Sequence, residues 1–238
     1  MRMVAILAVA ALSIGAGSAP RRMPIVAGGG GGGDAAIGIH ASASTGSATS
    51  VTTASRASTT GSAIVCGGVW SATATFSSLT DSASNTWTQI GTELTTANRD
   101  SRFYYCQNCT GSATHTFTLA TTASTSIVLA CVELLNVLTS GVFDLGDQGE
   151  DAATPFASPA ITTTAANEVL VGWTGIDDTA TATIAETTGF TVQEEFDGSV
   201  GIPAALMTRI VTSTGSYNFS YTRTGTTTTN NHIAGMKD

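Results

Sequence analysis

The residues of this chain that could carry chemistry are few, and their spacing matches no complete catalytic motif. Its three histidines, His40, His115 and His232, are isolated from one another, and no G-x-S-x-G, H-E-x-x-H or Walker lysine pattern is present. A Ser-His-Asp set could still assemble in space, but with 24 serines in the chain a chance match carries no weight. His115 lies on a strand of alternating threonines, so we expect it to face solvent or to pack. We therefore predict that the protein is not an enzyme and uses no cofactor.

Carboxylates offer two alternative kinds of site. Glu133 and Glu168 lie on or beside predicted strands, and a carboxylate pair on a jelly-roll sheet could hydrolyse a glycosidic bond. An acidic loop, together with Asp177 and Asp178, could bind Ca²⁺ through oxygen ligands, although no EF-hand spacing is present. The calcium candidates in that loop are Asp144, Asp147, Glu150 and Asp151. We expect a solvated loop and no metal site, because an acidic chain must place its charge somewhere.

The four cysteines have a spacing that leaves their oxidation state open. Cys106 and Cys109 form a C-x-x-C pair, whereas Cys66 and Cys131 are isolated in apolar runs. A structural zinc site would need a second close pair. A redox pair would need a helix N-terminus to lower the thiol pKa, which a strand-rich context does not offer. Buried thiols are the simpler expectation, and disulfides within the chain or between subunits are the alternative.

The three tryptophans could stack on sugar rings or could fill a core. Trp70 and Trp173 occupy near-equivalent places at the ends of two similar runs, as duplicated core residues would. Trp87 follows a turn and is the remaining candidate for an exposed glycan platform.

The composition favours strands over helices. The chain has 238 residues, of which only 11% are charged, against roughly 25% in typical soluble domains, while 42 threonines and 24 serines supply the polar surface. Threonine suits strands, and the strong helix formers are scarce. The formal charge of −8, with a single lysine and eight dispersed arginines, leaves no basic face for phosphates, so we exclude nucleic-acid binding.

The order of apolar runs repeats along the chain. Seven short runs lie between residues 50 and 135, and seven more lie between residues 160 and 236. The segment 62–70 corresponds to 167–173, and 111–118 corresponds to 215–221, at an offset of roughly 104 residues. We predict an all-β, two-sheet sandwich or jelly roll over residues 50–238, built from two degenerate seven-strand copies. The alternative is two separate sandwiches, at 50–140 and 158–238.

Residues 1–49 differ in character from the rest. A basic start, the apolar run 4–12 and small residues at Gly17 and Ala19 resemble a secretory signal peptide, cleaved after about residue 19. The alternative is an uncleaved apolar arm that docks on a neighbouring subunit. The apolar run is too short for a transmembrane helix. The six-glycine run 28–33 and the Ser/Thr/Ala-rich residues up to 49 indicate a flexible tether.

The segment from Asp81 to Trp87 has the sequence D-S-A-S-N-T-W. It resembles a D-S-x-G-N-T-W/Y turn in β-sandwich modules of bacteriophage virion proteins and bacterial surface proteins, and the strands 102–105 and 127–133 are similar to the pattern of those modules. The resemblance implies a non-enzymatic extracellular or virion module and supplies no catalytic residues. Ser84 stands where the resembling turns have glycine, so this turn must reach its geometry without the residue that adopts positive φ most easily.

These observations predict a structural, decorating or adhesive protein of a virion or cell surface. Its partners would be further copies of itself or other structural proteins, without nucleic acid. The alternatives are a carbohydrate-binding adhesin on the same fold and, third, a jelly-roll glycoside hydrolase.

Overall fold

The computed structural model describes residues 34–180, 183–225 and 227–238, and these ranges belong to one compact unit. The predicted signal peptide or arm and the glycine run lie outside the described residues. Within the described ranges, no helix has the length and apolar character needed to cross a bilayer.

The described residues contain sixteen β-strands, and every strand pairing among them is antiparallel. The strands of the first half are β1 (Ala36–Thr52), β2 (Ser62–Ser71), β3 (Phe76–Asp81), β4 (Thr88–Thr95), β5 (Arg99–Cys109) and β6 (Phe117–Leu135). Those of the second half are β7 (Phe143–Asp151), β8 (Phe156–Ala157), β9 (Ile161–Thr162), β10 (Glu168–Ile176), β11 (Ala185–Glu186), β12 (Thr191–Asp197), β13 (Pro203–Val211), β14 (Ser216–Tyr217), β15 (Ser220–Thr222) and β16 (Thr229–Lys237).

Each half of the chain forms one of the two main sheets. The first half gives the order β1-β6-β2-β5-β4, with β3 pairing to β6 as a sixth strand, and the second half gives β12-β13-β10-β16-β7. Read from the other edge, the second order is β7-β16-β10-β13-β12, which is the first order with each strand replaced by its counterpart along the chain. The small sheet β11-β15-β8 likewise matches the grouping of β3 with the first part of β6 and the last part of β1.

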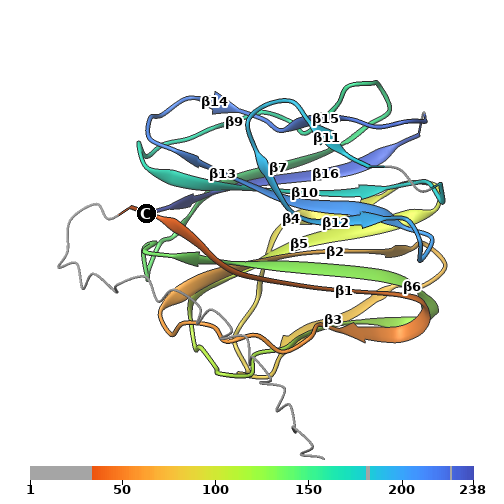
Figure 1. The fold of residues 1–238 in the computed structure, drawn as a ribbon, viewed down its shortest axis with the longest axis horizontal. Helices are drawn as coiled ribbons and strands as arrows, with labels where there is room; N and C mark the ends of the chain where they lie inside the picture. The colour runs from red at the N-terminus through yellow and green to blue at the C-terminus, as the bar shows by residue number, and fades with distance from the viewer. Residues whose placement is uncertain (1–33, 181–182, 226) are drawn as a thin grey trace, which may run out of the picture. The chain divides into compact units, whose positions relative to one another are not determined.

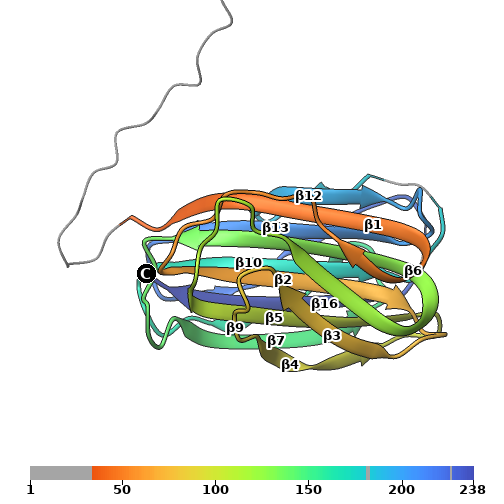
Figure 2. The ribbon, with the colours of Figure 1, turned by 90° about the horizontal axis from the view of Figure 1, so that it is seen from below.

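The two main sheets lie face to face, with the strands of one nearly above those of the other (Figure 2). Their central strands, β2 and β10, approach closely because small residues face large ones. A Cβ at Gly67 would lie 2.2 Å from the Trp173 ring, and a Cβ at Gly175 would lie 2.8 Å from the Val69 side chain. Both Trp173 and Val69 are fully buried in the core between the sheets.

The outer face of each main sheet is also covered, which gives four layers from bottom to top in Figure 1. Leu119 in the first part of β6 packs on Gly68, and Phe219, between β14 and β15, packs on Gly172. Two further apolar clusters lie under these covers, one around Phe117, Leu119 and Trp70 and one around Phe219 and Tyr221. The strands β2 and β10 therefore bury both faces, which explains their almost wholly apolar or small sequences.

Polar side chains also join the two sheets within the core. His232 of β16 is fully buried, and its Nε2 lies 2.8 Å from the Ser101 Oγ of β5. Asn230 donates from Nδ2 to the carbonyl oxygen of Arg99 at 3.2 Å. Burial lowers the pKa of His232 to about 3, so the ring is neutral at physiological pH. These bonds favour one alignment of the sheets, since a shift would leave buried polar groups without partners.

The structure confirms an all-β protein with two main antiparallel sheets packed as a sandwich. On the predicted strand of alternating threonines, Phe117 and Leu119 are buried together on one face, and the later part of the same strand, from Ile127 to Val132, is buried on both faces. The tether prediction is wrong for residues 36–49, because these residues form most of β1 and pair with β6. The acidic segment after residue 140 is likewise a strand, β7, where the sequence indicated a loop.

Substituting Gly67 tests the close approach of the two sheets. We expect Gly67→Ala to lower the free energy of unfolding by about 2–3 kcal/mol, because the new methyl group overlaps the buried Trp173 ring. Thermal or denaturant unfolding measures this change. Gly46→Ala in β1 is the control, since its Cβ would lie 3.8 Å from the nearest described atom, and it should leave stability unchanged or raise it by up to about 1 kcal/mol. Equal effects of the two substitutions would contradict this account of the core.

Candidate functional site around Asp81

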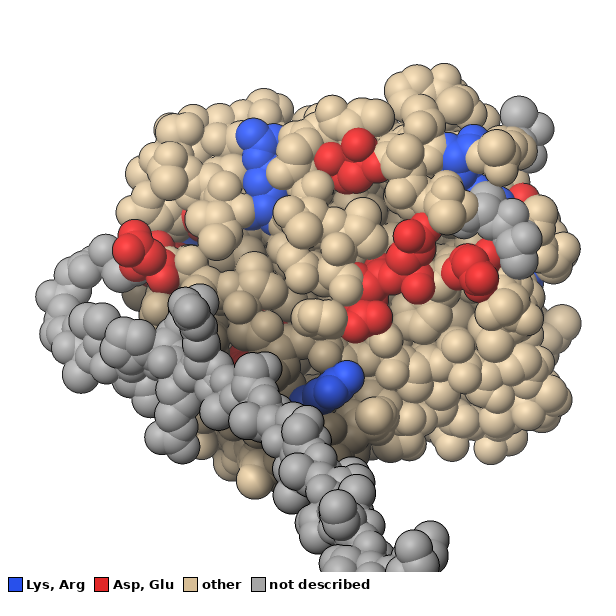
Figure 3. Space-filling view, viewed as in Figure 1, with Lys and Arg blue, Asp and Glu red and all other residues tan. Residues whose placement is uncertain are grey.

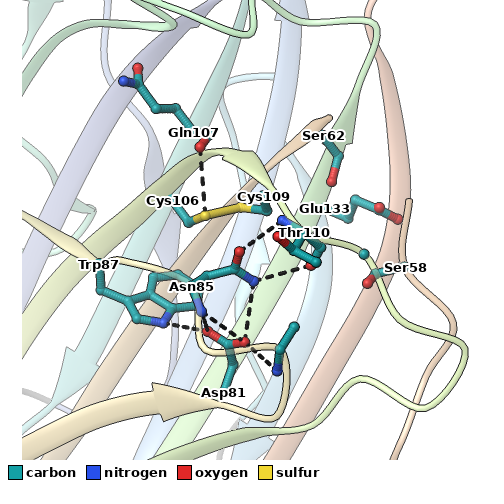
Figure 4. The surroundings of a disulfide bond; sticks show 12 residues. Ser58, Ser62, Asp81, Asn85, Trp87, Cys106, Gln107, Cys109, Thr110 and Glu133 are labelled. Carbon is teal, nitrogen blue, oxygen red and sulfur yellow. Dashed lines mark hydrogen bonds between the residues drawn. A yellow bond between two sulfur atoms is a disulfide. The ribbon is translucent and has the colours of Figure 1, made fainter. Parts of the chain in front are cut away.

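The turn that follows β3 is organised by one buried carboxylate. The Asp81 side chain is fully buried and accepts hydrogen bonds from the backbone N–H of Ala83 at 2.8 Å and of Asn85 at 3.2 Å. The indole Nε1 of Trp87 donates to Asp81 Oδ2 at 2.8 Å (Figure 4). The carboxylate thus holds the turn together, which gives a physical reason for the spacing of Asp, Asn and Trp in the motif.

Asn85 ties this turn to the end of β5. Its Nδ2 donates to the carbonyl oxygen of Thr110 at 3.1 Å, and its Oδ1 accepts from the Thr110 backbone N–H at 2.8 Å. The Nδ2 also donates to Asp81 Oδ1 at 3.2 Å (Figure 4). The Asn85 side-chain amide therefore pairs with the Thr110 backbone as the backbone of a neighbouring strand would. This pairing fixes the distance between the turn and the end of β5.

The turn reaches positive φ at Ser84, as its sequence predicts. Ser84 has φ of +59°, a left-handed conformation that is costly for residues other than glycine. The bonds to Asp81 on either side, from Ala83 and Asn85, hold this conformation.

His115 makes a further hydrogen bond with the Asp81 carboxylate. Its ring is fully buried, with Nε2 2.9 Å from Asp81 Oδ1 and Nδ1 2.6 Å from the Ser58 Oγ. Burial works to raise the pKa of Asp81, but the bonds from His115, Ala83, Trp87 and Asn85 together lower it below 3.8. His115 is therefore packed and bonded, which answers the alternative between a solvent-facing and a packed ring.

The chain Ser58–His115–Asp81 has the residue types of a hydrolase triad but not its arrangement. In a triad the carboxylate binds Nδ1 and the serine binds Nε2, whereas here the two ring nitrogens are exchanged. Ser58 Oγ also accepts the backbone N–H of Ser112 at 3.1 Å, so the oxygen is already used to fix a loop. We interpret this series of hydrogen bonds as a structural link that joins residues 54–60, the end of β3 and the residues just before β6.

All four cysteines are in disulfides within the chain, so the disulfide alternative is confirmed and the expectation of free buried thiols is wrong. Cys66 and Cys131 are direct partners on β2 and β6, and their disulfide lies in the apolar cluster on the outer face. Cys106 and Cys109 form a disulfide across the last four residues of strand β5 (Figure 4). Two disulfides indicate an oxidising environment.

A polar groove lies between the turn and the end of β5. It has a volume of about 400 Å³ and is lined by Ser84, Asn85, Thr86, Thr88, Cys106, Gln107, Asn108 and Thr110. None of these side chains is charged. Gln107 and Asn108 are exposed, and the amide of Gln107 points away from the disulfide (Figure 4). The groove therefore presents amides and hydroxyls on a backbone fixed by Asp81, Asn85 and the disulfide.

The structure separates the three tryptophans. Trp70 and Trp173 are fully buried, which confirms their assignment to the core, although Trp70 faces the outer cluster and Trp173 the core between the sheets. They are therefore not equivalent positions of the two halves. Trp87 is half-buried, its ring edge packs against Phe117 at 6.1 Å between centroids, and it is not among the residues that line the groove.

Glu133 and Glu168 cannot act as a catalytic pair. Glu133 shares the outer face of the first sheet with Cys131, whereas Glu168 shares the outer face of the second sheet with Leu170. Both sheets lie between the two carboxyl groups. Glu133 accepts the backbone N–H of Thr59 at 2.6 Å, and Glu168 that of Ala165 at 3.0 Å. The glycoside hydrolase interpretation therefore loses its two residues.

The calcium candidates lie along β7, and most of them already have partners in the protein. Asp144 binds Lys237, Asp147 accepts the backbone N–H of Gln148, and Asp151 accepts those of Ala153 and Ala157. Asp178 binds Arg223. Among the described residues, no group of three or more such side chains has the geometry of a metal site, Glu150 and Asp177 included.

No protein-family model matches the chain, and comparisons with curated proteins and with solved structures gave no match either. The resemblance to virion and surface modules therefore rests on the turn at Asp81–Trp87 and the strands around it.

Asp81→Asn tests the role of the carboxylate. We expect a loss of about 2–3 kcal/mol in the free energy of unfolding at neutral pH, because an amide cannot accept the same set of bonds. The lowered pKa of Asp81 means that the wild-type advantage is present above pH about 4 and is lost as the pH falls through the folded-state pKa. Asp147→Asn, at an exposed carboxylate, is the control and should cost less than about 0.5 kcal/mol. A wild-type advantage that stays constant as the pH falls through the acid range would contradict the assignment.

Ser84→Gly should stabilise the protein by about 0.5–1 kcal/mol, since glycine adopts φ of +59° without the steric cost of a Cβ. Ser78→Gly in β3 is the matched control and should destabilise by a similar amount, because Ser78 is a paired strand residue opposite Ala120 of β6. Thermal melting of both variants measures the difference in sign. A loss of stability in both would show that the Ser84 side chain matters more than its backbone.

Proposed function

We propose that the protein is a non-enzymatic structural, decorating or adhesive component of a virion or cell-surface assembly. The main support for this proposal is that most Asp, Glu and His side chains considered for catalysis are buried and hold the fold together. Asp81, His115, Glu133, Glu168 and His232 are buried, and each accepts or shares bonds that hold strands and turns. Chemistry on a substrate would require a reachable group of this kind, and the exposed His40 is itself bonded to Glu194 of β12, where it joins β1 to the other sheet.

The surface supports the same function. The face in Figure 3 is mostly uncharged; some of its acidic side chains lie over β12, which carries Glu194, Glu195 and Asp197, and others are scattered singly over the face. A surface of short hydroxyl side chains loses little rotamer entropy when copies pack together. Two disulfides suit a location outside the reducing cytoplasm, and we place the protein at an extracellular or virion surface.

We further propose that the fold is a duplicated jelly-roll-like module related to virion and surface sandwiches. The matching strand orders of the two halves support a duplicated jelly-roll-like module, and the Asp81–Trp87 turn supports kinship with virion and surface sandwiches. Self-assembly, or assembly with other structural proteins of the same particle, follows from that kinship.

Electron microscopy of the native protein tests the proposal. We expect regular oligomers, or ordered decoration of a larger particle, at the concentrations found in the source. A monomer at all concentrations, with no particle to which it binds, would contradict an assembly role.

A carbohydrate-binding adhesin is the second candidate, and the groove beside Asn108 is the observation that favours it. Neutral amides and hydroxyls on a fixed backbone suit the hydroxyl groups of a glycan. A glycan array with the full chain should give reproducible hits that weaken at least tenfold in Gln107→Ala and Asn108→Gly. Asn108 has φ of +51°, so glycine removes its amide without strain.

Trp87→Ala distinguishes the groove from a stacking platform. Loss of binding in Trp87→Ala alone would place the glycan on the tryptophan, and loss in the two groove variants alone would place it between the turn and β5. The absence of hits for the wild type in both soluble and particle-bound form would exclude the adhesin.

A further inference from the structure

Three ionisable side chains meet at one end of the second sheet, on the neighbouring strands β10, β16 and β7. Lys237, the only lysine of the chain, lies at the end of the middle strand β16. Its Nζ is 3.1 Å from the Oδ1 of Asp144, near the start of β7. Glu168, the first residue of β10, is the direct cross-strand partner of Lys237. The end of β16 lies beside the marked C-terminus in Figure 1.

The Asp144 carboxyl group is held in a fixed position. Its side chain is only 3% exposed, and its Oδ2 accepts the backbone N–H of Thr164 at 2.8 Å. The Thr164 hydroxyl donates to its Oδ1. Lys237 is held through its backbone, which donates to the carbonyl oxygen of Val142 at 2.7 Å. The amine of Lys237 and the carboxyl group of Asp144 are thus kept in contact by bonds on both sides.

Glu168 lies beside this pair, as the direct cross-strand partner of Lys237. It is fully buried, and its Oε2 lies directly over the backbone of Gly235 in β16. A side chain at position 235 would collide with it, because a Cβ there would lie only 2.4 Å from Oε2. That oxygen has no hydrogen-bond partner among the described atoms. Burial, aided by the nearby Asp144 carboxylate, raises the pKa of Glu168 to about 7, so protonated and ionised forms coexist at neutral pH.

We propose that Lys237 and Asp144 form an intramolecular isopeptide bond, and that Glu168 transfers the protons this reaction needs. The ionised Glu168 takes a proton from the Lys237 ammonium. Because the pKa of the free Asp144 carboxyl is about 2, the acid so formed delivers this proton to the Asp144 oxygen only as the nitrogen attacks. The neutral Nζ attacks Cγ of Asp144, forming the C–N bond. A second proton passes from nitrogen through Glu168 to the departing hydroxyl, the C–O bond breaks and water leaves. An ammonium and a carboxylate become an amide and water, with no oxidant or reductant.

The identity of the residue at 237 supports this reaction over a simple ion pair. The chain uses arginine at its eight other basic positions, and arginine forms the better geometric pair with a carboxylate. A guanidinium is not a nucleophile, whereas the amine of lysine becomes one when it loses its proton. A partly exposed ion pair would contribute only about 0–1 kcal/mol, which gives little reason for the single lysine to stand here.

Mass spectrometry of the purified full chain tests the bond. After reduction and digestion, we expect the peptide that contains Asp144 to be linked to the C-terminal peptide, at the sum of their masses minus one water. Lys237→Arg keeps the charge and should abolish the linked peptide completely. Complete recovery of both unlinked peptides from the wild type, even after prolonged incubation at pH 7–8, would overturn the proposal.

Two further variants distinguish this chemistry from other losses of water. Glu168→Gln keeps the shape of the side chain but cannot transfer a proton, so linkage should be at least tenfold slower or absent. Asp144→Asn should still react, with loss of ammonia in place of water. A loss of water that persists in Lys237→Arg would come from another site, such as the Asp197-Gly198 pair, and would count against the bond. If a variant fails to fold, digestion of the wild-type protein still decides the question, because the linked peptide is either present or absent.

Discussion

The close approach of the central strands β2 and β10 is the constraint on which the rest of the structure depends. Gly67 and Gly175 give room for Trp173 and Val69, while Gly68 and Gly172 receive Leu119 and Phe219 on the outer faces. Each central strand thus alternates small and large positions on both of its faces, and four layers pack without voids at the glycines. A longer side chain at any of these glycines would push apart the two layers that meet there, and the neighbouring glycine contacts of the same strand would be lost as well.

This packing explains the composition of the chain. Layers that are covered on both sides need small or apolar residues, and only the covers and edges remain for polar ones. Short hydroxyl side chains meet that need, because they bond to one another across strands, as Thr52 does with Thr118 and Thr75 with Thr122. Charge is then concentrated in a few places with definite partners, such as Asp81 with His115 and Asp144 with Lys237.

The sequence predicts the features that depend on local pattern and misses those that depend on register. Alternation identified the strand of Phe117 and Leu119, and the motif located the strained Ser84. The first strand was missed because its Ser, Ala, Thr and Gly residues are also those of a tether, and only long-range pairing with β6 makes it a strand. Cross-strand disulfide partners, and the opposite faces of Glu133 and Glu168, likewise become visible only when strands are aligned.

The two halves differ at one edge in a way that gives the Asp144–Lys237 contact a physical role. In the first half, the edge strand β1 has 17 residues and pairs with β6 at both of its ends. Its counterpart in the second half is divided into β7, of nine residues, and the two-residue β8, with Pro155 between them. An edge strand with fewer pairing bonds opens more easily. A link between Asp144 and Lys237 closes β7 at its first residues, where fraying would begin, and so supplies by a side-chain bond the hold that the longer β1 obtains from its backbone.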